Sequence, residues 1–131
     1  MMKGKSLISV FLCFCLAGCT GVAVLGGAAA GIAGYKWYEG ALEVIYQAPY
    51  IETWDAALRA LEGMNLQIKS KEHDLIAGRI EAKRADKKDV SVDVKYKSSK
   101  ETDVLIRVGL LGDKAAADAI HQEIRKELFG R

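Results

Sequence analysis

The chain has 131 residues, of which 50% are hydrophobic and 27% charged, with 19 Lys+Arg against 17 Asp+Glu and a formal net charge of +2. This length suits one small domain with a single core, because domains typically have about 50 to 200 residues. The near balance of charge argues against a general attraction to nucleic acid, so any binding of anions must come from local asymmetry.

The first nineteen residues have the pattern of an export signal. Lys3 and Lys5 precede an apolar run from Leu7 to Leu16, and two small residues separate this run from Cys19. A charged start, about 7–15 apolar residues and a small residue before the cut are the features of secretory signal peptides. The run is too short to span a bilayer as a helix, which needs about 20 residues. We therefore predict that residues 1–18 are a cleaved signal peptide.

The end of this segment, Leu16-Ala17-Gly18-Cys19, resembles the lipobox of bacterial lipoproteins. The resemblance implies that Cys19 is acylated and attaches the mature protein to a membrane. The alternatives are a plain secretory signal and a chance cysteine after an apolar membrane anchor. Thr20 stands where an aspartate would resemble an inner-membrane retention signal, so we expect the periplasmic side of the outer membrane. Because Cys13 and Cys15 leave with the signal, the mature chain retains no free thiol for a disulfide, a nucleophile or a metal site.

Residues 19–39 form the next segment, which is apolar and rich in Gly and Ala over residues 21–34. Gly27 and Gly31 have the spacing of small residues in helices that pack closely within membranes. Two alternatives remain open, namely a segment in the membrane interface beside the lipid and a flexible tether of small residues.

Three aromatic residues close this segment, at Tyr35, Trp37 and Tyr38. Aromatic rings beside an apolar segment are typical of anchors at the membrane interface. They suit equally well a cap on the core of the folded domain, and both alternatives remain open.

The folded domain is predicted to span residues 40–131, beginning with a strand and a helix. Residues 41–47 alternate between apolar and polar side chains, as in a strand with one buried face. Pro49 is pre-set for the first turn of a helix, and apolar side chains follow at helical spacing. This stripe consists of Ile51, Trp54, Leu58 and Leu61. Gly63 is expected to end the helix as a left-handed cap.

Four short strands and a second helix complete the predicted domain. Apolar and polar residues alternate within residues 66–69, 76–83, 90–97 and 103–108, which indicates an antiparallel meander with one buried face. Asp113 is a good N-cap, and the helix after it has an apolar stripe at Ala117, Ile120, Ile124 and Leu128. The order β-α-β-β-β-β-α predicts an α+β two-layer sandwich, in which two helices cover one face of an antiparallel sheet of about five strands.

Several short motifs give the chain a family resemblance. Ala48-Pro49 with W-x-x-x-L-x-x-L-x-x-M up to Met64, GRIEA at 78–82 and IRVGLLGD at 106–113 resemble a family of small bacterial lipoproteins catalogued only as a domain of unknown function. The resemblance covers nearly the whole mature chain and implies no catalytic residue. More distantly, the order of elements is similar to that in a lipoprotein accessory to outer-membrane protein assembly, but topology alone does not carry function.

The residue types offer little for catalysis. His73 and His121 are the only histidines, and no Ser-His-Asp arrangement, phosphate loop or spaced carboxylate pair can be placed. His73 lies between Glu72 and Asp74, but in an exposed turn a solvated histidine is the ordinary state rather than a metal ligand. We therefore expect a protein that is not an enzyme, with no catalytic residue, metal or cofactor.

One local charge asymmetry is predicted. If the apolar strand faces pack under the helices, the opposite sheet face carries seven cations, against Glu81 and Asp93. These cations are Lys69, Lys71, Arg79, Lys83, Lys95, Lys97 and Arg107. Such a face is a candidate for binding an anionic envelope component, such as phospholipid headgroups, lipopolysaccharide or an acidic protein. The alternative is a solvated face whose lysines deter pairing with other sheets.

Two classes of function follow from these features. The first is an interaction or scaffolding module of the cell envelope, attached to the membrane through Cys19, with an envelope protein or anionic lipid as partner and no nucleic acid. The second is a periplasmic carrier of a small hydrophobic or lipid ligand between the sheet and its helices. A cavity above about 300 Å³ would favour the carrier, and a packed core would favour the scaffold.

Overall fold

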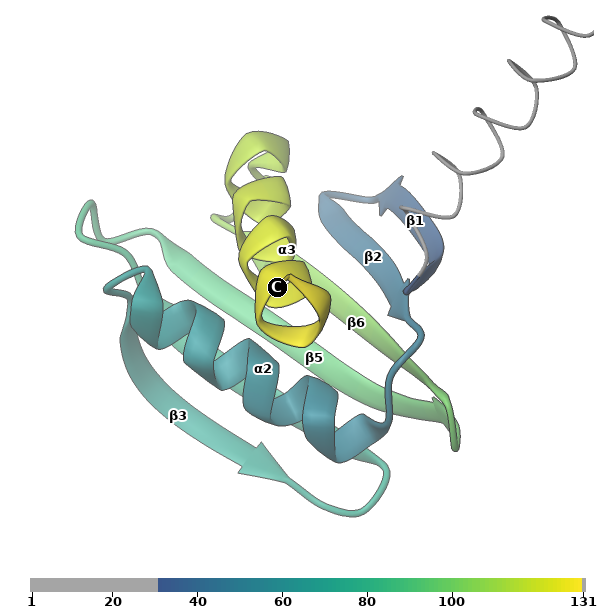
Figure 1. The fold of residues 1–131 in the computed structure, drawn as a ribbon. Helices are drawn as coiled ribbons and strands as arrows, with labels where there is room; N and C mark the ends of the chain where they lie inside the picture. The colour runs from purple at the N-terminus through teal and green to yellow at the C-terminus, as the bar shows by residue number, and fades with distance from the viewer. Residues whose placement is uncertain (1–30, 131) are drawn as a thin grey trace, which may run out of the picture. The chain divides into compact units, whose positions relative to one another are not determined.

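Two helices lie side by side over one face of an antiparallel sheet in the computed structural model, which describes residues 31–130 (Figure 1). The predicted signal peptide at residues 1–18, Cys19 and Gly27 lie outside the described residues. The chain from Gly31 onward forms one unit. Its elements are β1 (Ile32–Tyr38), β2 (Ala41–Tyr46), α2 (Tyr50–Gly63), β3 (Gln67–His73), β4 (Ala77–Lys83), β5 (Asp89–Ser98), β6 (Glu101–Val108) and α3 (Lys114–Phe129).

The strands of this unit form one six-stranded sheet in the order β1-β2-β6-β5-β4-β3, and each neighbouring pair is antiparallel. Strands β3 to β6 make the predicted meander. Strand β2 pairs with β6, and α2 then carries the chain across the sheet to its opposite edge at β3. The predicted α+β class and element order are therefore confirmed, with β1 as an additional strand.

The folded unit begins earlier than the predicted boundary at residue 40. Strand β1 pairs with β2 from Ile32, opposite Tyr46, to Tyr38, opposite Ala41. The sequence did not predict this strand because it contains Gly and Ala, which have low strand propensity, and because a bulge before Gly34 interrupts the alternation. The strand forms despite this low propensity because pairing with β2 satisfies its backbone hydrogen-bonding groups.

The core lies between the sheet and the two helices. Alternate strand residues fill it as predicted, and none of the following is more than 2% exposed: Leu42, Val44, Tyr46, Ile80, Ala82, Val90, Val92, Val94, Val104, Ile106 and Val108. Helix α3 adds Ala117, Ile120 and Ile124 from its predicted stripe. This helix also begins as predicted, because Oδ1 of Asp113 accepts a hydrogen bond from the N–H of Ala116 at 3.1 Å.

The buried face of helix α2 differs in part from the apolar stripe predicted from the sequence. Trp54 and Leu61 are buried as expected, but Ile51 is 50% exposed and Leu58 is only partly buried. The buried side instead contains small residues, Thr53, Ala56, Ala57 and Ala60. Small side chains allow α2 to approach the sheet and α3 closely. Close packing, and not the number of large apolar side chains, therefore determines which face is buried.

Helix α2 also ends differently from the prediction, with a Schellman motif at Asn65 instead of a left-handed Gly63. Gly63 is the last helical residue, and the positive φ of 61° belongs to Asn65. The N–H of Leu66 donates to the carbonyl of Leu61 at 3.1 Å, and the N–H of Asn65 donates to that of Glu62 at 3.0 Å. These are the two hydrogen bonds that define the motif, and asparagine tolerates the left-handed conformation.

Trp54 packs its ring directly over Gly78 of β4. A Cβ atom on Gly78 would lie 2.6 Å from Cζ3 of Trp54 and 2.5 Å from Cβ of His73. The His73 ring also contacts the indole, with the two ring centroids 4.6 Å apart and the ring planes tilted by 46°. The indole is only 4% exposed, so the absence of a side chain at position 78 makes room for it.

We predict that Gly78→Ala lowers the free energy of unfolding by about 1–3 kcal/mol, because the new methyl group overpacks a filled site. The matched control is Gly63→Ala, since a Cβ atom on Gly63 would meet no atom within 4 Å. Alanine in this helical position should leave stability unchanged or raise it slightly. Urea denaturation measures both variants, and equal midpoints would contradict the close contact between Trp54 and Gly78.

Candidate functional site

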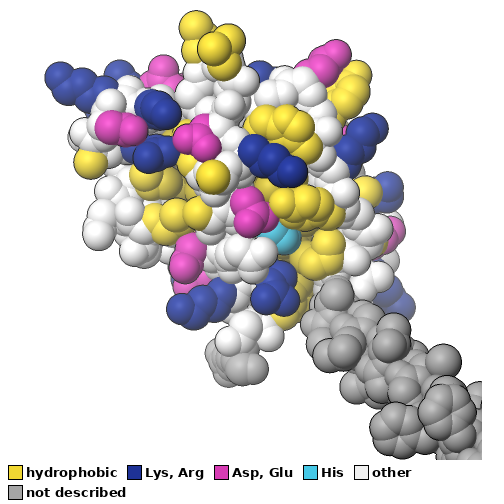
Figure 2. Space-filling view, turned by 90° about the horizontal axis from the view of Figure 1, so that it is seen from above, with side chains coloured by type: hydrophobic (Ala, Val, Ile, Leu, Met, Phe, Trp, Pro, Cys, Tyr) yellow, Lys and Arg dark blue, Asp and Glu magenta, His cyan; other side chains and the backbone are white. Residues whose placement is uncertain are grey.

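The sheet face that the helices leave uncovered, called the open face below, carries charges of both signs. Its residues alternate with the buried ones along four strands: Glu43 and Ile45 of β2, Arg79, Glu81 and Lys83 of β4, Asp89, Ser91, Asp93 and Lys95 of β5, and Asp103, Leu105 and Arg107 of β6. Acidic residues therefore stand between the predicted cations. Charges of both signs also lie among hydrophobic side chains on the surface shown in Figure 2.

Lys71 does not lie on the open face, contrary to the prediction. A bulge between Ile68 and Ser70 shifts the register of β3, so that Lys71 stands opposite Ile80. Because Ile80 is buried under the helices, Lys71 belongs to the helix-covered side of this edge strand. A bulge adds one residue to one strand, and alternation in the sequence does not reveal it.

The other six predicted cations belong to the open face. Arg79, Lys83, Lys95 and Arg107 are there by register, and Lys69 lines the same hollow as Arg79 and Arg107. Lys97 lies at a bulge in β5 and acts electrostatically on Asp103. The pKa of Asp103 is nevertheless raised, first by partial burial and then by the nearby Glu43.

Arg79, a cation of the open face, forms an ion pair with Asp93. Nε of Arg79 donates to Oδ1 of Asp93 at 2.6 Å, and its Nη2 donates to Oδ2 at 3.1 Å, a bidentate geometry that holds both groups. These hydrogen bonds raise the pKa of Arg79. Nζ of Lys83 lies 3.8 Å from Oδ1 of Asp89. The hollow of about 480 Å³ beside them has acids and bases in its lining, which favours a solvated, self-compensated face over an anion site.

The three aromatic residues before Gly40 belong to β1. The hydroxyl of Tyr35 donates to Oδ1 of Asp118 in α3 at 2.8 Å, and Trp37 packs, half-buried, against the core. Tyr38 is 50% exposed, with Nζ of Lys36 4.8 Å from the centre of its ring. Of the three, Trp37 packs as a cap on the core would, and Tyr35 is 48% exposed.

A buried polar pair lies under this cap. The Tyr46 hydroxyl is 2.7 Å from Nδ1 of His121 and donates to this nitrogen when the imidazole is neutral with its proton on Nε2. His121 is 4% exposed, and burial lowers its pKa, with Arg125 acting in the same direction and Asp118 opposing it. Burial likewise raises the pKa of Tyr46. The pair is thus a satisfied, uncharged element of the core.

His73 is part of the packing at the β3–β4 turn. Its ring lies against that of Trp54 in a tilted contact, whereas Glu72 stands opposite Arg79 on the open face. The carboxylate of Asp74 accepts the backbone N–H groups of residues 76 and 77, which lowers its pKa and closes the turn. Among the described residues, no group of three His, Cys, Asp or Glu side chains is placed to hold a metal ion.

A second feature is the loop between β6 and α3, in which the sequence did not predict an exposed apolar pair. Leu110 and Leu111 are 95% and 91% exposed. The loop is nevertheless closely packed, because a Cβ atom on Gly112 would collide with the backbone of Gly40 in the β1–β2 turn, and both glycines have positive φ. The only sequence signal was a leucine pair between Gly109 and Gly112, outside the period of either neighbouring element.

An apolar hollow of about 330 Å³ lies between the end of α2, the start of α3 and the β4–β5 turn. Its lining includes Met64, Leu66, Ala116, Ala119 and Ile120. The periodicity of the sequence gave no indication of it, because its walls come from the ends of separate elements. Of the buried core residues named above, Ile120 is the one in its lining.

Neither helix within residues 31–130 is long and apolar enough to cross a membrane. Residues 5–127 match the protein family described as "Protein of unknown function (DUF3568)". A comparison with curated proteins finds no match.

The buried His121 predicts a loss of stability in acid. Its folded pKa is lowered, while an unfolded histidine titrates near about 6.5. The unfolded chain therefore binds more protons, and stability that is present above about pH 6.5 is lost as the pH falls toward the folded pKa. Each tenfold difference in proton affinity corresponds to about 1.4 kcal/mol.

We expect His121→Gln to flatten the fall in unfolding free energy between about pH 7 and pH 5 relative to the natural chain. Denaturant titrations at a series of pH values measure it. The control is His73→Gln, which removes an exposed histidine. If His121→Gln flattens the profile no more than His73→Gln does, burial of a neutral imidazole is not the cause.

Proposed function

The chain belongs to the DUF3568 family, and we propose that it is a lipid-anchored protein of the bacterial cell envelope that acts as a non-catalytic interaction or scaffolding module. In this proposal residues 1–18 are removed, Cys19 is acylated and the domain is held on the periplasmic side of the outer membrane. The charged start, the apolar run and the small residues before Cys19 support the anchor.

The observation that carries the interaction role is the loop at Leu110 and Leu111. Full burial of a leucine side chain normally stabilises a protein by about 1.5–3 kcal/mol. A loop that holds two of them in solvent on a backbone fixed by Gly40 and Gly112 is therefore suited to contact another molecule. An envelope protein is the partner we propose for this loop, because a paired apolar projection fits a pocket on a protein surface.

The apolar hollow beside Met64 and Ile120 favours a second candidate, a carrier of a small hydrophobic or lipid ligand. Its volume of about 330 Å³ is near the lower end of small-molecule sites. It is a surface hollow between the ends of elements, while the middle of the domain is filled by side chains. For this reason we place the carrier second to the interaction module.

The test places a photoreactive amino acid at Leu110 in the full-length protein in its own envelope, with the same residue at Leu75 as matched control. Both leucines are almost fully exposed. The Leu110 probe should give a protein adduct of defined mass that Leu75 does not give. Adding Leu111→Asp should reduce that adduct severalfold, because the apolar contact loses its second side chain.

The same experiment tests the anchor through Cys19→Ser. The natural protein should fractionate with the membrane and the variant with the soluble proteins, and the Leu110 adduct should decrease accordingly. An adduct that persists after Leu111→Asp, or that Leu75 also forms, would contradict the loop as the contact. A natural protein found in the soluble fraction would contradict the anchor.

A further inference from the structure

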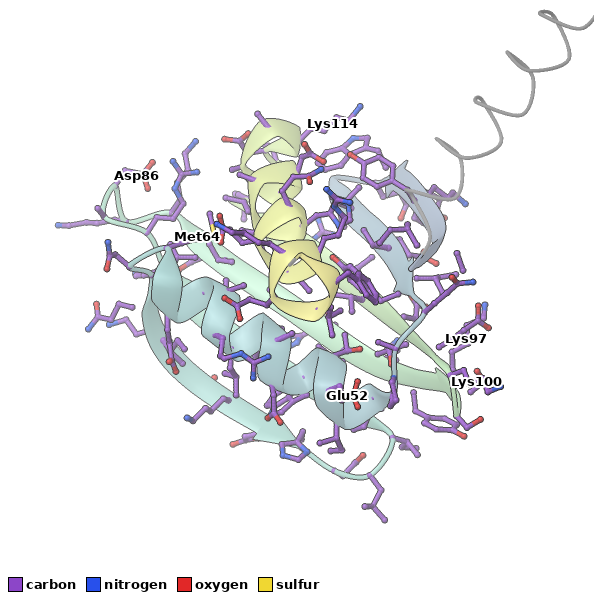
Figure 3. The ribbon with its side chains drawn as sticks, viewed as in Figure 1. Glu52, Met64, Asp86, Lys97, Lys100 and Lys114 are labelled. Carbon is purple, nitrogen blue, oxygen red and sulfur yellow. The ribbon has the colours of Figure 1, made fainter. Side chains whose placement is uncertain are left out.

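The strands run between two ends of the domain. The Gly31 end, as we call it, contains the start of β1, the end of β2, the start of α2, the β3–β4 turn and the β5–β6 hairpin (Figure 1). The Gly40 end contains the β1–β2 turn, the β4–β5 turn and the loop before α3. Lys97 and Lys100 lie at the first end, and Met64 and Asp86 lie at the other (Figure 3).

The chain from the predicted anchor joins the domain at the Gly31 end. The N–H of Gly31 donates to Oε1 of Gln47 at 3.0 Å, and the carbonyl of Gly31 accepts the N–H of Gln47 at 2.6 Å. Gln47 in turn lines a hollow of about 550 Å³ together with Ser98, Ser99, Lys100 and Glu101 of the β5–β6 hairpin. The point where the chain enters and the tip of this hairpin are therefore neighbours.

The β3–β4 turn exposes apolar side chains at the same end. Leu75 is 88% exposed and Ile76 is 63% exposed. The turn is fixed in place, because the carboxylate of Asp74 accepts two of its N–H groups and the carbonyl of Ile76 accepts the N–H of Tyr96 at 2.7 Å. Tyr96 is itself 47% exposed, so an aromatic ring stands between the apolar turn and the lysines of the hairpin.

We propose that the Gly31 end docks on a phospholipid bilayer, with Leu75 and Ile76 entering the headgroup region, Tyr96 at its boundary and Lys97 and Lys100 on the phosphates. This inference rests on the proposed lipid anchor, and it adds which part of the domain faces the membrane. Exposed apolar side chains beside a tyrosine and lysines match the composition of membrane-interface contacts. Neither lysine forms an ion pair with a described residue.

The position of the anchor selects the membrane as the occupant of this surface. Cys19 precedes Gly31 by 12 residues, so an anchored chain keeps the Gly31 end within about 40 Å of the bilayer even when fully extended. Such tethering raises the effective concentration of a weak contact. The Gly40 end is farther along the chain by the seven residues of β1, about 23 Å, so with the Gly31 end docked Leu110 and Leu111 lie at the end away from the membrane.

The test uses the full acylated protein in vesicles of phosphatidylethanolamine and phosphatidylglycerol. A cysteine with an environment-sensitive fluorophore is placed at Ser99 in the β5–β6 hairpin or, as matched control, at Asp86 in the β4–β5 turn. Nitroxide-labelled lipids should quench the probe at Ser99 severalfold more than the probe at Asp86. In the Ser99 protein, Leu75→Ser with Ile76→Ser should remove most of this difference, while Leu110→Ser with Leu111→Ser should leave it.

Each outcome has one meaning. Equal quenching at Ser99 and Asp86, or stronger quenching at Asp86, would overturn the proposed orientation, as would indifference to the Leu75 and Ile76 substitutions. Failure of the anchor itself is seen separately, because the natural protein without an added cysteine then takes up the fluorophore on a free Cys19 thiol. An unlabelled natural protein with equal quenching at both ends would leave the anchor intact and overturn the docking alone.

Discussion

The pairing of β1 with β2 is the constraint on which the rest of the account depends, because it fixes where the chain enters the sheet. It brings the chain into the sheet at Gly31, through two hydrogen bonds with Gln47. Pairing also places Tyr35 over the buried His121, so that the edge strand closes one side of the core. Because residues Ile32–Tyr38 form a strand of the sheet, this part of the chain belongs to the folded unit and is not a loose tether.

This constraint separates two apolar projections that would otherwise be equivalent. Leu75 and Ile76 lie at the end where the chain enters, and Leu110 and Leu111 lie at the end where β1 turns back. Both are held by local packing, one by the Asp74 turn and the other by the contact between Gly40 and Gly112. We propose that the first projection contacts the membrane and that the second contacts a protein partner.

The regular elements could be predicted from the sequence because their signals are local. Alternating valines in β5 and the Asp113 cap of α3 needed no knowledge of the fold. The errors arise where tertiary contacts decide. Strand β1 depends on β2 for its hydrogen bonds, the bulge before Lys71 reverses its side of the sheet, and the exposed pair at Leu110 and Leu111 depends on a contact between distant glycines. Six of the seven predicted cations do lie on the open face, but the prediction did not count acids such as Asp89 and Asp103 that the neighbouring strands place among them.

Hydrogen–deuterium exchange of the full-length, membrane-anchored protein tests most directly whether the chain enters the domain as a strand. The account predicts that amides within Ile32–Tyr38 that bond to β2 exchange far more slowly than those of an unstructured chain, because exchange requires the edge strand to open. Exchange of the whole segment at the rate of an unstructured peptide would contradict it. Residues 19–39 would then be a tether, and neither the orientation of the domain nor the separation of its two apolar ends would follow.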